Sequence, residues 1–161
     1  MMFALAIALA QLQSPPPSAA PSPSRPPLVH RGPQTTPRVV PGDITIRNTG
    51  STNFAGYTIV VHASGAADVT VGGETVPKTL AAPQTKWLFA KVLAATPLDT
   101  MPAAGCIKSA SFGSVTTVSY GGTTSPDISC GGDATMREIA RTVGVVTARL
   151  GVRPQRRLPK P

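Results

Sequence analysis

Residues 57–71 decide the fold, and their sequence is Tyr-Thr-Ile-Val-Val-His-Ala-Ser-Gly-Ala-Ala-Asp-Val-Thr-Val. The first five residues are all aromatic or β-branched, and the last four alternate polar and apolar side chains. Both patterns favour strands. The small residues Ser64-Gly65-Ala66-Ala67 between them favour a turn, and Gly72-Gly73 stops the second strand. The stretch therefore predicts two antiparallel strands, 57–62 and 68–71.

Further strands are predicted on either side of this hairpin. Ile44-Thr45-Ile46 alternates and predicts a short strand, which a turn at 50–53 separates from the hairpin. Downstream, residues 108–112 and 115–120 also have strand character, with Gly113-Ser114 as a bulge or turn between them. The chain thus offers three strands before residue 80 and two after residue 107.

Two helices complete the predicted fold. Residues 83–94 change to helical spacing, with Pro83 suited to a first turn. A second helix is predicted over 135–150, capped by Asp133 or Thr135 and ended by Gly151. Its apolar positions form one stripe, which predicts burial in a core. These positions are Met136, Ile139, Ala140, Val143, Val146 and Leu150.

The predicted order is β-β-β-α-β-β-α, which indicates an α+β fold. We expect one antiparallel sheet of four to five strands with both helices packed on one face. Residues 43–150 are expected to form this single domain. Because the helix stripe is assigned to the core, no oligomer seam is left and a monomer is expected.

The flanks of this domain have a different composition. Residues 1–10 are apolar and close on Ala8-Leu9-Ala10, which predicts a cleaved signal peptide and a secreted or periplasmic bacterial protein. No Lys or Arg precedes the apolar run, so a buried or disordered N-terminus is the alternative. Residues 11–42 are rich in Pro and Ser and predict a disordered linker. Residues 151–161 predict a basic disordered tail, and no stretch is long enough for a transmembrane helix.

Most of the net charge of +8 belongs to the flanks. Residues 43–150 hold eight basic and seven acidic residues, a net charge of +1, and the other seven basic residues lie outside them. Basic arms attract polyanions weakly. Contact of the tails with anionic lipid or envelope polymer is therefore an alternative function, whereas nucleic acid is not expected as a partner of an exported protein.

Cys106 and Cys130 are the only cysteines. In an exported chain this pair predicts one structural disulfide. In the chain-entropy model, closing this loop stabilises the fold by about 3.5 kcal/mol.

The residues and motifs of the sequence predict no enzyme activity, no metal site and no cofactor. His62 is the only histidine of residues 43–150, and no G-x-S-x-G, Walker or G-x-G-x-x-G motif is present. A hydrolase that uses His62 is a weaker hypothesis. Lys108 and Ser109 are adjacent, so on a strand they would point to opposite faces. Asp127 and Asp133 suit a turn and a helix cap.

A resemblance adds a candidate partner. The segments Cys106-Ile107-Lys108-Ser109-Ala110-Ser111-Phe112-Gly113 and Ser125-Pro126-Asp127-Ile128-Ser129-Cys130 are similar to a pattern in small, uncharacterised, secreted bacterial proteins. More loosely, residues 44–150 resemble emfourin-type inhibitors of thermolysin-like metallopeptidases. That likeness lies in Asn53-Phe54-Ala55-Gly56 leading into a strand and in the order of elements that follows.

The resemblance implies a small sheet-plus-two-helix protein, and we expect a non-catalytic exported module that binds a protein such as an extracellular or periplasmic peptidase. The candidate contact residues lie in two loops. They are Asn53, Phe54, Lys108, Ser109 and Phe112. The alternative is an envelope-associated structural protein that contacts anionic polymer or lipid through its basic tails.

Overall fold

The computed structural model of the protein describes residues 42–109 and 111–152. The predicted signal peptide, nearly all of the linker and most of the basic tail lie outside these residues. Ten elements follow one another along the chain: β1 (Ile44–Gly50), β2 (Ala55–Val61), β3 (Ala66–Val71), β4 (Glu74–Thr79), α1 (Ala82–Ala94), the 3-10 turn η1 (Leu98–Thr100), β5 (Thr116–Tyr120), β6 (Thr123–Thr124), the 3-10 turn η2 (Ile128–Cys130) and α2 (Ala134–Arg149).

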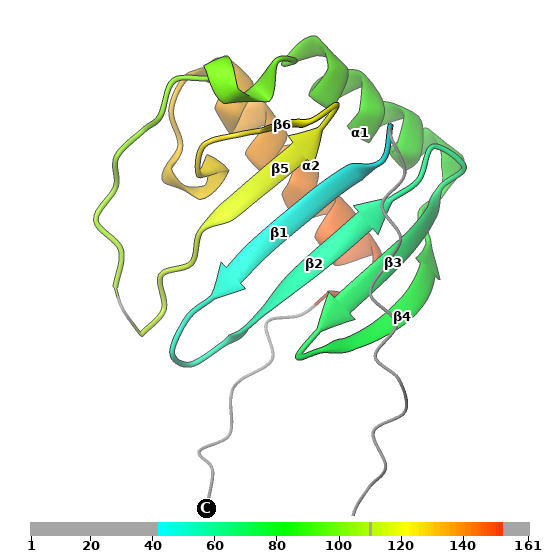
Figure 1. Ribbon diagram of the computed structural model, residues 1–161, viewed down its shortest axis with the longest axis horizontal. Helices are drawn as coiled ribbons and strands as arrows, with labels where there is room; N and C mark the ends of the chain where they lie inside the picture. The colour runs from blue at the N-terminus through cyan, green and yellow to red at the C-terminus, as the bar shows by residue number, and fades with distance from the viewer. Residues whose placement is uncertain (1–41, 110, 153–161) are drawn as a thin grey trace, which may run out of the picture. The chain divides into compact units, whose positions relative to one another are not determined.

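The strands form one antiparallel sheet in the order β4-β3-β2-β1-β5-β6 (Figure 1). The register pairs Ile44 with Val61 and Ile46 with Ile59 across β1 and β2. Because side chains alternate along a strand, these four residues share one face of the sheet. The predicted α+β class with an antiparallel sheet is confirmed.

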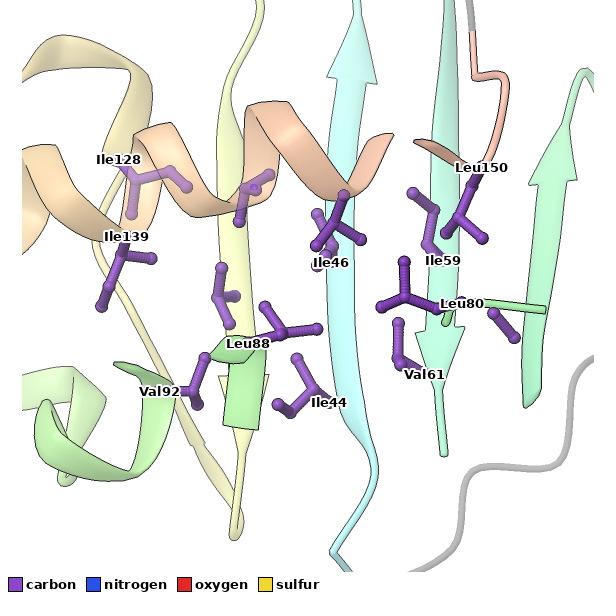
Figure 2. Close-up of a cluster of buried hydrophobic side chains, with 14 of the residues drawn as sticks. Ile44, Ile46, Ile59, Val61, Leu80, Leu88, Val92, Ile128, Ile139 and Leu150 are labelled. Carbon is purple, nitrogen blue, oxygen red and sulfur yellow. The ribbon is translucent and has the colours of Figure 1, made fainter. Parts of the chain in front are cut away.

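Both helices cover that same face (Figure 1). Leu88 and Val92 of α1 and Ile139 of α2 belong to one buried cluster with the β1 and β2 side chains, as Figure 2 shows. The cluster also includes five of the six predicted stripe residues of α2, and the sixth, Ala140, packs against it. The stripe is therefore core, as its spacing predicted.

The ends of α2 follow the local signals in the sequence. The Asp133 carboxylate accepts a hydrogen bond from the backbone N–H of Met136 at 2.8 Å, so Asp133 is the N-cap. At the other end Gly151 has a φ of +70°. The N–H of Gly151 donates to the Ala148 carbonyl, and that of Val152 donates to the Thr147 carbonyl. This pair of bonds is a Schellman motif, which favours glycine at that position.

The sheet differs from its prediction in strand number and in one strand's place. It has six strands instead of four to five, because β4 and β6 add to it. β4 is an exposed edge strand that contains Pro77, which edge positions tolerate. The predicted strand at 108–112 is wrong. Its described residues form part of a loop, in which the Gly113 N–H donates to the Ser109 carbonyl and turns the chain back.

The described part of the chain has no helix that combines the length and the apolar character needed to cross a bilayer.

Candidate partner-binding site

A long loop, residues 101–115, connects η1 to β5 and has no helix or strand among its described residues. A disulfide joins its Cys106 to Cys130 at the end of η2, with the two Cα atoms 5.3 Å apart. The predicted disulfide is confirmed. Connections of this length without secondary structure are uncommon in compact domains and are often functional.

The ion pair between Lys108 and Asp127 is a second link between this loop and the rest of the domain. The Lys108 ammonium donates to Asp127 Oδ2, to the Ser114 carbonyl and, at 2.5 Å, to Ser129 Oγ. Asp127 Oδ1 accepts the backbone N–H groups of Thr116 and Ser129, each at 3.0 Å. Lys108 was predicted as a partner contact. Its ammonium group instead forms an ion pair with Asp127 of the same chain.

The chemistry of Asp127 follows from these contacts. Burial raises the pKa of the carboxyl, but hydrogen bonds from Lys108, from Ser129 and from two backbone N–H groups outweigh burial and lower the pKa to about 2. Asp127 is therefore ionised at neutral pH. Ser129 Oγ joins the same cluster, because it accepts from Lys108 and donates to Asp127 Oδ1 at 2.6 Å.

The structure brings the two predicted contact loops together. Ser51 Oγ donates to the Ser111 carbonyl at 2.9 Å, and the Asn53 N–H donates to the same oxygen at 3.3 Å. The rings of Phe54 and Phe112 lie 6.0 Å apart between centroids, at 50° to one another. This distance is within the range in which aromatic pairs attract.

A cavity of about 460 Å³ lies between the tip of the β1–β2 hairpin and the end of the long loop. We call it the hairpin cavity. Its lining residues are Asn48, Gly50, Ser51, Phe54, Ala55, Tyr57, Phe112 and Ser114.

Asn48 holds this end of the sheet together. Its Nδ2 group donates to Ser114 Oγ at 3.0 Å and to Thr116 Oγ1 at 2.8 Å, and its Oδ1 accepts from the Gly50 N–H at 2.8 Å. These bonds join β1 to the first residue of β5 and to Ser114 just before it. Asn48 is thereby satisfied within the chain, so its role is to position the wall of the cavity.

Several apolar side chains of the long loop face solvent. Ile107 is fully exposed, at 105%, and Phe112 and Val115 are 62% and 39% exposed. Ser109 is also exposed, whereas Asn53 and Phe54 are half-buried. The outward-facing groups of the long loop are thus largely apolar.

His62 lies directly after β2, at the opposite end of that strand from the tip of the hairpin. Its Nδ1 is 3.0 Å from Asp43 Oδ2, and its Nε2 is 3.5 Å from Asp68 Oδ2. The hydrogen bond to Asp43 raises the pKa of His62 more than burial lowers it. Among the described residues the imidazole contacts these two carboxylates and no hydroxyl nucleophile. In the same residues no three His, Cys, Asp or Glu side chains gather as a metal site.

The chain was compared with protein-family models, with curated proteins and with solved structures, and none of the three gives a match.

The sequence predicts contacts at Phe54 and Phe112 but not at Asn48, Tyr57 or Ile107. Asn48 carried a signal, because it places a polar residue in the same alternating series as Ile44 and Ile46. Tyr57 was indistinguishable from a core strand residue. The exposure of Ile107 depends on the path of the loop, which local sequence does not encode.

Proposed function

We propose that this protein is a non-catalytic, exported binding module. Its partner is an extracellular or periplasmic protein such as a peptidase, which it binds as an inhibitor does. The contact surface, here called the loop surface, consists of Phe54, Ile107, Phe112 and Val115 together with the hairpin cavity. The observation that carries the proposal is the exposure of Ile107 and Phe112 on a loop that is fastened at Cys106 and Lys108.

Exposed apolar side chains support a protein partner. Leaving large apolar groups in water costs free energy, and binding recovers it. Gathered apolar groups on a surface mark interaction sites, and aromatic residues are enriched at the centres of interfaces. Phe54 and Phe112 supply such an aromatic pair.

The anchors of the loop support tight binding. A mobile loop loses conformational entropy when a partner orders it, and that loss weakens association. Here the disulfide and the Lys108–Asp127 ion pair hold the loop before any partner arrives. A pre-ordered loop beside a disulfide is suited to enter a peptidase cleft as an inhibitor.

Two side chains that could do acid–base chemistry, Lys108 and His62, are engaged within the chain. Lys108 is bound to Asp127, and His62 lies between Asp43 and Asp68. These contacts give both groups structural roles and support a function in binding.

The test is a titration of the purified chain against a panel of thermolysin-like peptidases, with residual peptidase activity as the readout. We expect at least one enzyme to be inhibited at micromolar concentrations. Ile107→Ala and Phe112→Ala should each weaken inhibition by tenfold or more, since central interface residues cost about 2 kcal/mol or more when truncated.

The matched control is Leu93→Ala, because Leu93 is a 50% exposed apolar residue on α1, outside the loop surface. It should inhibit like the parent chain. Absence of inhibition across the panel, or equal loss in Leu93→Ala and Phe112→Ala, would remove the inhibitor mode.

A further inference from the structure

The walls of the hairpin cavity are uncharged. All eight lining residues are neutral, and three of them, Phe54, Tyr57 and Phe112, are aromatic. A charged group that entered would lose hydration without gaining an ionic partner from the wall, which is strongly unfavourable. The cavity therefore selects against charged occupants.

The same walls hold two hydroxyl groups with hydrogens to donate. Tyr57 has no hydrogen-bond partner among the described residues, and its hydroxyl belongs to a side chain that lines the cavity. Ser114 Oγ accepts from Asn48 but donates to no described residue. Burial raises the pKa of Tyr57, so this hydroxyl keeps its proton and remains a donor at neutral pH. An occupant with an acceptor oxygen near these groups would satisfy both.

The size and the rings of the cavity point to the shape of the occupant. Its volume of about 460 Å³ falls within the about 300–1,000 Å³ of sites that hold small organic groups. Aromatic rings prefer tilted or offset neighbours, and Phe54 and Phe112 already meet at 50°. A third ring can pack against them in the same manner.

We propose that the hairpin cavity receives one uncharged aromatic side chain of the partner protein, with a carbonyl oxygen of that residue accepting hydrogen bonds from Tyr57 and Ser114. The identity of the occupant as part of a protein rests on the proposed function. The chemistry of the site rests on the cavity alone.

The probe is N-acetyl-L-phenylalanine amide, which carries an uncharged ring and two carbonyl oxygens. It is titrated into the ¹⁵N-labelled full chain, and amide chemical shifts are recorded. We expect saturable shifts for Asn48, Ser51 and Ser114. The blocked amides of lysine and aspartate, used in parallel, should produce no saturable shifts at these positions.

Two variants separate the ring contacts from the hydrogen bond. Phe112→Ala should weaken probe binding about tenfold, because ring pairing and buried area are both lost. Tyr57→Phe keeps the ring and removes the hydroxyl, so the loss should be about fivefold. Tyr120→Phe is the matched control, because Tyr120 packs edge-on against Phe89 and does not line the cavity. It should leave probe binding unchanged.

Equal binding of the charged probes, shifts that map outside the cavity, or full affinity in Tyr57→Phe would overturn the proposal. The experiment contains no peptidase, so its failure is distinguishable from failure of the proposed function. Probe binding without inhibition would support the cavity proposal and contradict the proposed inhibitor function. Inhibition without probe binding would support the proposed function and contradict the cavity proposal.

Discussion

The β1–β2 hairpin has two halves on one face of the sheet, and they have opposite properties. In the first half the inward side chains are aliphatic and fully buried (Figure 2). These are Ile44, Ile46, Ile59 and Val61. In the second half the same face carries mixed residues that line a cavity. These are Asn48, Gly50, Ala55 and Tyr57.

The difference lies in what covers each half. α1 covers the first half with Leu88 and Val92, and Leu150, directly after α2, belongs to the same buried cluster. The long loop 101–115 lies beside the second half and leaves a space of about 460 Å³. One pair of strands thus supports a stable core at one end and offers a recognition surface at the other. Substitution of a buried aliphatic residue should therefore change stability, whereas substitution of an exposed residue such as Phe112 should change binding.

The largest expected effect is in the sealed half. Ile46 is fully buried, so Ile46→Ala should lower the free energy of unfolding by about 2–5 kcal/mol through lost burial and a new cavity. Urea unfolding followed by circular dichroism measures this. A loss below about 1 kcal/mol would show that the helices do not seal this half as tightly as described.

The disulfide should have the next largest effect, and it acts on the loop. Replacement of Cys106 and Cys130 by serine together removes a covalent link across 24 positions of sequence. The chain-entropy model predicts a loss of about 3.5 kcal/mol of stability. Inhibition should fall as well, because the loop is no longer pre-ordered. Full inhibition by the double variant would show that the covalent anchor is not needed for the loop surface.

Lowering the pH should weaken the Lys108–Asp127 anchor of the long loop before it affects the buried aliphatic core. The ordinary pKa of Asp127 is 3.8, and its contacts lower it to about 2 in the folded chain. A lowered pKa stabilises the fold fully above the ordinary value, and the stabilisation is lost as the pH falls from about 4 towards 2. Asp127→Asn should therefore cost about 2 kcal/mol at pH 7.

The acid prediction is checked by urea unfolding of the parent chain and Asp127→Asn at pH 7 and near pH 2. The two proteins should differ at pH 7 and converge at the lower pH. A constant difference would assign the effect of the substitution to packing instead of charge.

The smallest expected effect belongs to His62, next to the sealed half. Asp43 raises the pKa of His62, so the protonated imidazole stabilises the fold fully below the ordinary value near 6.5. That contribution is lost as the pH rises through the raised pKa. It should be smaller than about 1 kcal/mol, because the pair is partly exposed to solvent.

An NMR titration of the His62 ring measures this pKa directly. Asp43→Asn should move it downward. An unchanged titration in Asp43→Asn would show that the contact does not persist in solution.

The sequence predicted the elements whose patterns are strong and local. The hairpin of β2 and β3, both helices and the Asp133 cap follow from alternation, helical spacing and a capping residue. β4 was missed because an exposed edge strand with Pro77 lacks an alternating buried pattern. Residues 108–112 have strand propensity, but the disulfide, the Lys108 ion pair and the turn at Gly113 override it.

Individual residues of the candidate site were predictable from the sequence, but their arrangement around a cavity was not. Phe54 and Phe112 were named from their loops, but their contact depends on how residues 101–115 return to the hairpin tip. Tyr57 has the properties of a core residue, and only the loop that fails to cover it makes it part of a cavity. Such features depend on tertiary packing, which propensity does not encode.

The most direct test of the account measures one variant, Phe112→Ala, in two ways. Phe112 is 62% exposed, so its free energy of unfolding in urea should stay within about 0.5 kcal/mol of the parent chain. Its affinity for an inhibited peptidase should fall by tenfold or more. A clear loss of stability with full affinity would contradict the division between a sealed half and a binding half.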